Sequence, residues 1–432
     1  MNGSKLSFAA IVGFCGACIA FYIGAGFSTL QEVVQYDASY GSLFPIVILV
    51  CVVVYLYTNY SFATNGSRLK LERGGDIYTA YCGKYIGKFY DWFAAFFCYM
   101  CFIVMCGGAN STLIELFGLY GIEVPNGVGA VVLTVLVVIT GVFGLKGILN
   151  ALGKLGPVII ICIIVVCTIS CFNVPAGSFQ SGLAAVDSGQ YSEVMKQVGG
   201  GNPWASGASY AGFVILWFAA FIAEIGAKNK LKEVNIGMTL SIVFIALTAT
   251  VACIALISHI EETSSAAIPI LFLANAINPG FSVVLAIIIF TGIYTTSVPL
   301  LWTGVKAVAK EGTQRYKIGI VVGGIIGCVV ALFVDYRVLV NVLYGLNGYL
   351  GFILVAFMII YDIRTRLSTK HAAPIGPVLG GYEGASETAA GQVSDVAQVS
   401  SPVQDAKAAM NTEAGQVSDA APNAEAGDAD SA

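Results

Sequence analysis

Long apolar runs, each about the length of a membrane crossing, alternate with short polar segments along most of this chain. A helix needs about 20 mainly apolar residues to span a bilayer. We predict an all-α integral membrane protein with ten spans, at residues 7–35, 42–65, 89–118, 127–145, 152–172, 207–227, 233–258, 280–309, 315–334 and 337–363.

The first span does not keep an unbroken apolar pattern. Gly24 and Gly26 flank Ala25 near its middle, and polar residues follow, including Glu32. Glycine disfavours helix by about 1 kcal/mol relative to alanine, so we predict that this helix unwinds at mid-membrane. Close packing through small residues is the alternative explanation. Glu32 favours a functional break in the helix over close packing, because a carboxylate inside a membrane is costly.

Charge supports the count of spans. The chain is 57% hydrophobic and only 11% charged, far below the charge of a soluble domain. With the N-terminus in the cytoplasm, nineteen Lys and Arg residues fall on the inner side, and only Lys196 and Arg337 fall outside. Positive residues concentrate on the cytoplasmic side of membrane proteins. We therefore place both termini in the cytoplasm.

The chain divides into a core and a tail. Residues 1–370 form the predicted ten-helix transporter core, whereas residues 371–432 hold nine acidic residues and one lysine. Such a segment cannot bury a hydrophobic core, so we expect a disordered acidic cytoplasmic tail. The twelve cysteines lie nearly all in apolar segments, which favours buried thiols over disulfides.

Ten spans divide into five plus five, the inverted-repeat plan of many transporters. The sixth span is then the equivalent of the first, and we predict that it breaks at Tyr210, Ala211 and Gly212, with residues 219–220 as the alternative. Glu224 follows that break as Glu32 follows the first. The pair suits gating or proton transfer, although Glu224 also suits an interfacial partner of Lys228.

The eighth span carries an oxygen-rich cluster. Thr295, Thr296 and Ser297 precede Pro299, which leaves the carbonyl of residue 295 without its helical partner. Hard cations prefer oxygen ligands, so we predict a sodium site here, completed by backbone carbonyls of the first span. The alternative is that the hydroxyls bond back to their own helix.

The backbone amides of Ala25, Gly26, Phe27 and Ser28 would begin the second half of the first helix. Amides at a helix start favour an anionic group, such as a substrate carboxylate. No Lys or Arg lies in the middle of a span, so a zwitterion suits the site better than a dianion. At the outer end we expect Glu115 at the membrane interface, and residues 267–277 as a short external helix over the entrance.

Residues 23–37 read I-G-A-G-F-S-T-L-Q-E-V-V-Q-Y-D. This stretch resembles the opening motif of the YkvI-type bacterial membrane proteins, roughly G-A-G-F-A-(S/T)-G-Q-E-I, in the amino acid–polyamine–organocation superfamily. Gly24, Ala25, Gly26, Phe27, Gln31 and Glu32 match that motif. Leu30 stands where the family usually has glycine, which puts the local backbone geometry in question.

The resemblance implies a LeuT-like fold, a bacterial inner-membrane location and a substrate site between the first and sixth helices. Carried over, Gly24 and Phe27 would offer carbonyls to a sodium ion, and Thr295, Thr296 or Ser297 would offer the remaining oxygens. Members that use protons instead would make Glu32 or Glu224 the proton carrier.

These observations favour a sodium-coupled symporter for a small amino acid or similar zwitterion, working by alternating access. A proton-coupled transporter and a nutrient sensor without flux are the alternatives. We expect neither an enzyme nor a nucleic-acid partner nor an organic cofactor, because no phosphate-binding loop or metal-ligand cluster is present in the sequence. The oligomeric state stays open.

Overall fold

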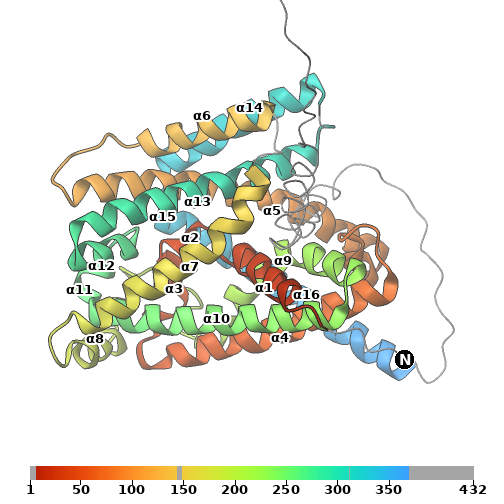
Figure 1. Ribbon diagram of the computed structural model, residues 1–432, viewed down its shortest axis with the longest axis horizontal. Coiled ribbons are helices and arrows are strands. Elements are labelled where there is room, and N and C mark those ends of the chain that lie inside the picture. The colour runs from red at the N-terminus through yellow and green to blue at the C-terminus, as the bar shows by residue number, and fades with distance from the viewer. Residues whose placement is uncertain (1–5, 144–147, 311, 369–432) are drawn as a thin grey trace, which may run out of the picture.

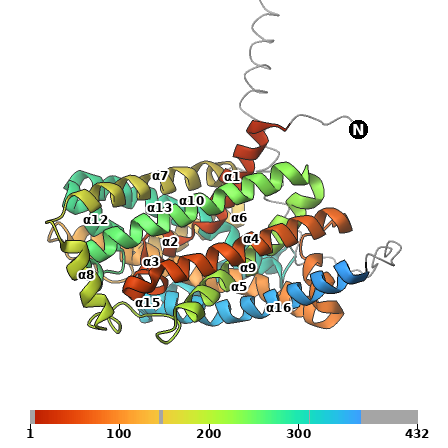
Figure 2. The same cartoon turned by 90° about the horizontal axis from the view of Figure 1, so that it is seen from below.

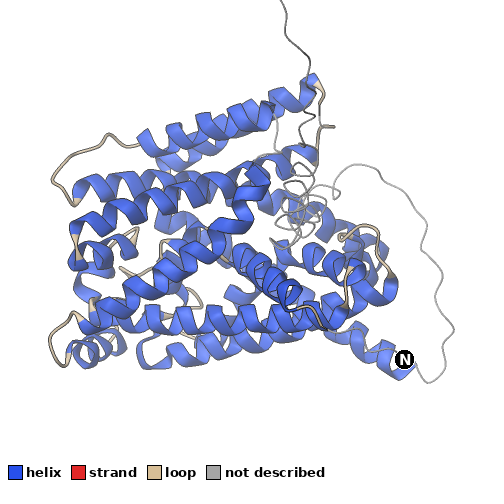
Figure 3. Ribbon diagram, viewed as in Figure 1, coloured by secondary structure: helices blue, strands red, loops and turns tan. Residues whose placement is uncertain are grey.

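The computed structural model describes residues 6–143, 148–310 and 312–368, and every regular element in those ranges is a helix (Figure 3). The predicted tail at residues 371–432 lies outside the described residues. The helices in chain order are α1 Phe8–Tyr22, α2 Ala25–Ser28, α3 Gln31–Tyr36, η1 Ala38–Leu43, α4 Phe44–Leu69, α5 Asp76–Gly118, α6 Val128–Phe143, α7 Ile148–Phe172, α8 Ser178–Asp187, α9 Pro203–Lys228, α10 Leu231–Ser258, α11 Ile260–Thr263, α12 Pro269–Ile277, α13 Pro279–Lys306, α14 Gln314–Phe333, α15 Tyr336–Leu339, η2 Val340–Tyr344 and α16 Gly345–Ser368.

The long helices lie side by side in one bundle (Figures 1 and 2). Seven helical stretches of the described chain are long and apolar enough to cross a membrane, and three shorter apolar helices lie in α1, α6 and α7. Together they occupy the positions of the predicted spans. The count of ten crossings itself stays a prediction, because the apolar stretches found within α1, α6 and α7 are each only 10–17 residues long.

Helix α9, the predicted sixth span, lies at the centre of the bundle. Of its most apolar 18-residue window, 83% is buried, compared with 33% for α14. Its main neighbours are α4 on one side and α16 on the other. This central position explains why α9 is apolar around its whole circumference.

The predicted break in the sixth span is wrong, because α9 is continuous from Pro203 to Lys228. The glycine that prompted that prediction has a packing role instead. A Cβ on Gly212 would overlap the backbone of Gly348 in α16, and a Cβ on Gly351 would overlap the backbone of Gly212. Small residues let two membrane helices approach closely. The glycine at residue 212 therefore marks a close contact between helices and not a break in one.

The first helix is interrupted, as predicted. Helix α1 ends at Tyr22, and Gly24 is extended with φ −86° and ψ −176° before α2 begins at Ala25. A second interruption follows at Leu30, which adopts the left-handed conformation with φ 65° and ψ 8° before α3 begins. Leucine takes the conformation that glycine adopts most easily, so the substitution at the glycine position of the motif does not prevent this turn.

Short helices gather at the end of the bundle that we predict to be external. Figures 1 and 2 place α8 and α12 at the same end, and α11 connects to α12 there. Helix α12 spans Pro269–Ile277, which confirms the predicted short helix. The third span begins earlier than expected, because α5 starts at Asp76 and bends at Gly83, where φ is 76°.

Candidate functional site

The carboxylate of Glu32 lies in the interruption between α1 and α2. Its side chain folds back from α3 onto Gly26, where any Cβ would overlap it. Oε2 accepts a hydrogen bond of 3.2 Å from the Tyr210 hydroxyl of α9. Oε1 has no hydrogen-bond partner among the described residues, and Glu32 is only 2% exposed. The broken first helix therefore holds an acidic group at its centre, joined to the central helix.

A column of aromatic rings continues from this carboxylate through the core. Tyr210 stacks on Tyr36 with ring centroids 4.6 Å apart, and Phe213 stacks on Tyr344 at 4.5 Å. Trp217 stands edge-on to Phe213 at 5.9 Å. Three polar atoms in this column lack a partner within the described chain, namely the hydroxyls of Tyr36 and Tyr344 and the indole nitrogen of Trp217.

Unpaired polar atoms in a protein interior cost about 1–3 kcal/mol each. Several of them beside one carboxylate indicate a place where water or a polar ligand completes the hydrogen bonding. The indole ring of Trp217 and the side chain of Met105 both lie 3.7 Å from where a Cβ on Gly24 would be. The column therefore borders the helix break directly.

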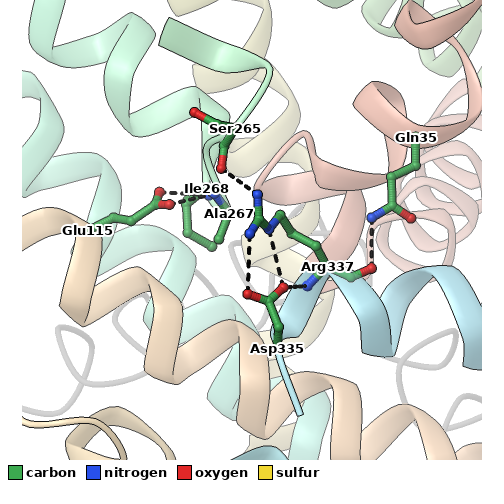
Figure 4. A network of polar contacts seen from close by, with 7 residues as sticks. All are labelled: Gln35, Glu115, Ser265, Ala267, Ile268, Asp335 and Arg337. Carbon is green, nitrogen blue, oxygen red and sulfur yellow. Dashed lines mark hydrogen bonds and ion pairs between the residues drawn. The ribbon is translucent and has the colours of Figure 1, made fainter. Parts of the chain in front are cut away.

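A polar network joins loops and short helices at the end of the bundle that we predict to be external (Figure 4). Glu115 of α5 accepts hydrogen bonds from the backbone N–H groups of Ala267 and Ile268, the second at 2.7 Å. The expected place of Glu115 at the membrane interface stays a prediction, and the structure adds that its carboxylate has backbone partners. The carboxylate is held by the loop before α12, because two backbone donors there need an acceptor.

Arg337 anchors the other side of the network. Its guanidinium donates to the Ser265 carbonyl at 2.7 Å and to Asp335, with Nε 3.2 Å from Oδ1. Its own carbonyl accepts from Gln35 Nε2 at 2.8 Å. Burial acts to raise the pKa of the Asp335 carboxyl, but the hydrogen bonds and charge of Arg337 outweigh burial and lower it.

The same loop also contacts the broken helix. The backbone N–H of Ile270 donates to the Thr29 carbonyl at 3.3 Å, and the Thr29 hydroxyl lies 3.2 Å from that of Tyr336. In the amide orientation that satisfies its surroundings, Gln31 donates to the Ala266 carbonyl at 3.0 Å. The segment after the helix break is thus bonded to the loop before α12 and to α15.

The predicted sodium ligands lie on two helices that touch, because α2 packs against α13. In this structure the Thr295 hydroxyl donates to the carbonyls of Thr291 and Gly292, and the Ser297 hydroxyl donates to the Ile293 carbonyl at 2.6 Å. These bonds match the alternative to a sodium site, in which the hydroxyls bond back to their own helix. Oxygen atoms keep further lone pairs, so the sodium assignment stays a prediction.

The predicted substrate-binding and gating residues of the first span and of α9 come together only in part. Tyr210 reaches Glu32, whereas Ala211 and Gly212 are buried in the packing of α9. Glu224 is 5% exposed and forms an ion pair with Lys228 one turn later. Glu224 thus has the interfacial partner that the sequence offered as the alternative.

Asp37 is a buried acid that the sequence analysis did not single out. It follows α3, is 1% exposed, and neither carboxylate oxygen has a hydrogen-bond partner in the described ranges. It lines a small cavity of about 30 Å³ between α4, α9 and α10, whose other walls are aromatic and aliphatic. An acidic residue at the end of a span, with no basic residue nearby in sequence, was the available signal.

Several solved structures are similar to this one. The structure of MhsT in complex with L-phenylalanine matches with a TM-score of 0.58 and 14% identity, over 94% of this chain and 99% of that chain. A Na⁺-coupled sialic acid symporter matches with a TM-score of 0.49 and 13% identity, over 93% of each chain. The nucleobase-cation-symport-1 family transporter MHP1 matches with a TM-score of 0.46 and 11% identity, over 91% of this chain and 99% of that chain.

No family model and no curated protein matches the sequence. At 14% identity the likeness to MhsT establishes the fold alone. The chain is thus a multi-pass, all-helical membrane protein with the LeuT-type transporter fold. Membership of the YkvI-type group remains a prediction from the motif.

Proposed function

We propose that this protein is a secondary active transporter that moves a small solute across a bacterial inner membrane by alternating access. One observation carries the proposal: the first helix is broken at Gly24, and the break holds the buried, incompletely bonded carboxylate of Glu32. Irregular backbone at membrane depth is tolerated where it lines a cavity or is buried in protein. Such broken helices form the central binding sites of transporters.

The outer network supports alternating access. Glu115, Arg337 and Gln35 close one end through bonds to loops and short helices, which can separate without unfolding a long helix. Rigid-body gating around a fixed central site is the general motion of this class. Within this proposal, these contacts would hold the predicted external end closed.

Sodium is the coupling ion that we favour, in symport with the solute. The support is the contact between α2 and α13: α2 carries Phe27 and directly follows Gly24, and α13 carries Thr295, Thr296 and Ser297. Proton coupling is the second candidate, and its support is Glu32, a buried carboxylate with one unpaired oxygen. Small amino acids and similar zwitterions are the first solutes to test.

The experiment is uptake into proteoliposomes that contain the purified full-length protein. Labelled amino acids and amines are offered under an inward sodium gradient, and under the same potassium gradient as a control. Accumulation only with sodium supports symport. Accumulation that follows a proton gradient instead supports the second candidate, and binding without accumulation under any gradient contradicts a transport function.

A further inference from the structure

One end of the bundle carries a group of exposed basic side chains. They lie at the ends of α4, α9 and α16 and at the start of α10, away from the end that holds the short helices α8 and α12 (Figure 1). We call this group the basic end, and its members are Arg68, Lys70, Lys228, Lys230, Lys232 and Arg364.

Contacts between helices hold the basic end together. Arg68 of α4 donates a hydrogen bond of 2.8 Å to the Tyr361 hydroxyl of α16. A Cβ on Gly66 of α4 would overlap the backbone of Ala223 in α9, so these two helix ends lie in close contact. Helix α10 begins at Leu231, shortly after α9 ends. Basic side chains from four separate helices are therefore gathered on one surface.

Nearby acidic residues neutralise only part of this charge. Glu224 and Glu233 are each 5% exposed and form ion pairs with lysines of the basic end. Asp362 already accepts hydrogen bonds from neutral side chains of α4, and Glu72 is exposed in the connection after α4. A surface that keeps an excess of positive charge attracts an anionic partner. Four members of the basic end form no ion pair within the described chain, namely Arg68, Lys70, Lys232 and Arg364.

The chain itself supplies a strongly acidic segment that follows this surface. Helix α16 ends at Ser368, and residues 371–432 then hold nine acidic residues and one lysine, a net charge of −8. The sequence G-Q-V-S-D occurs twice in that segment, at 391–395 and at 415–419, so acidic groups recur along it. The tail therefore has the charge opposite to that of the surface from which it starts.

Covalent attachment favours the tail over a free partner. A randomly coiled chain of about 60 residues spans about 40 Å on average, and Arg364 and Tyr361, the partner of Arg68, both lie close to the end of α16. A tethered partner acts at an effective concentration in the millimolar range. Single exposed ion pairs are weak, but several acidic groups on one tether act together.

We propose that the acidic tail at residues 371–432 docks on the basic end through several carboxylates, which pair with Arg68, Lys70, Lys232 and Arg364. A docked tail bridges α4, α10 and α16 at one end of the bundle. The inference goes beyond the proposed transport function and is tested without uptake, so either one can fail while the other stands.

A water-soluble carbodiimide tests the docking on the purified full-length protein in a neutral detergent, because it joins a carboxylate to a lysine only where the two are in contact. Mass spectrometry identifies the linked peptides, and we expect acidic residues of the tail to be linked to Lys70 and Lys232. Lys196 is the internal control, since it is exposed in the loop between α8 and α9. Linkage of the tail to Lys196 as often as to Lys232, or no linkage of the tail at all, would overturn the inference.

Salt and isotope labelling show what kind of contact is linked. Screening shortens the reach of exposed charges to about 3 Å at about 1 M salt, so we expect linkage to fall severalfold when sodium chloride is raised to that concentration. Linkage that is unchanged in high salt would contradict pairing of charges. In a mixture of isotopically light and heavy protein, links between the two kinds of chain would mean that the tail docks on another copy, which would also overturn the inference.

Lys70→Gln combined with Lys232→Gln is the decisive variant, because it removes two unpaired charges from the basic end. We expect linkage of the tail to the remaining lysines of the basic end to fall by about threefold or more, as for the loss of two exposed ion pairs. Lys310→Gln combined with Lys317→Gln is the matched control. Both of these lysines are exposed, and they lie at the α13–α14 connection, whose helices pack mainly against α5 and α6. Equal reductions in the two variants would mean that the net charge of the protein attracts the tail, and would overturn docking at the basic end.

Anionic lipid is the competing occupant of a basic surface near a membrane. The linkage measurement is therefore repeated in nanodiscs of phosphatidylcholine and in nanodiscs that contain phosphatidylglycerol. We expect the tail to be linked to Lys70 and Lys232 in both. Linkage that disappears when phosphatidylglycerol is present would assign the basic end to lipid headgroups and overturn the inference.

Discussion

The carboxylate of Glu32 occupies the space that the side chain of residue 26 would fill if that residue were not glycine. The two positions belong to separate short helices, and the left-handed turn at Leu30 brings them together. The absence of a side chain at residue 26 is thus what allows an acidic group to enter the helix break.

Gly26→Ala should therefore impair the site, because the new Cβ would displace the Glu32 carboxylate. Gly24→Ala is the matched control, since the nearest atoms to a Cβ there are at an ordinary contact distance of 3.7 Å. We expect solute uptake to fall by about tenfold or more in Gly26→Ala, as for loss of a charge-assisted hydrogen bond, and much less in Gly24→Ala. Equal effects of the two substitutions would contradict this steric explanation.

Glu32→Gln should lower uptake while expression and folding stay normal. Glutamine can still accept the hydrogen bond from Tyr210 but carries no charge and no exchangeable acidic proton. Glu224→Gln is the comparison, because that carboxylate already has Lys228 as its partner. Uptake kinetics that match the wild type in Glu32→Gln would remove Glu32 from the transport mechanism.

The left-handed turn predicts an unusual order of stability at residue 30. Leu30 is fully buried, so both Leu30→Ala and Leu30→Gly should destabilise the protein by removing its packing. The left-handed conformation costs alanine about 1–2 kcal/mol that glycine does not incur. Thermal unfolding in detergent should show Leu30→Gly to be more stable than Leu30→Ala, and the reverse order would argue against a left-handed residue 30.

The outer network predicts which backbone amides lose protection when it is cut. Glu115→Ala removes the acceptor of the Ala267 and Ile268 N–H groups, so hydrogen exchange of those amides should become faster. Glu123→Ala is the control, because Glu123 is exposed. Unchanged exchange at residues 267–268 in Glu115→Ala would mean that this contact does not close the outer end.

The sodium assignment predicts a changed ion requirement. Thr296→Ala or Ser297→Ala should raise the sodium concentration needed for half-maximal uptake, because each removes one candidate oxygen ligand. Thr291→Ala changes an exposed hydroxyl one turn earlier on the same helix, and it should leave the requirement unchanged. A sodium response like that of the wild type in both of the first two variants would exclude these hydroxyls from the site.

The sequence by itself determined the all-helical membrane fold, the interruption of the first helix and the short helix α12. These features are local: an apolar run of spanning length must lie in lipid, and glycine pairs weaken a helix wherever they occur. The same local signal failed at Gly212, because a helix break and a close helix contact both call for a residue without a side chain.

Tertiary structure alone decided which polar groups meet. Glu115 and the loop before α12 are far apart in the chain, as are Arg337 and Ser265, and only packing brings each pair together. Asp37 likewise reads as an ordinary residue at the end of a span until α4, α9 and α10 enclose it. Burial turns a carboxylate from a solvated group into one that needs a partner, and burial is a property of the assembled helices.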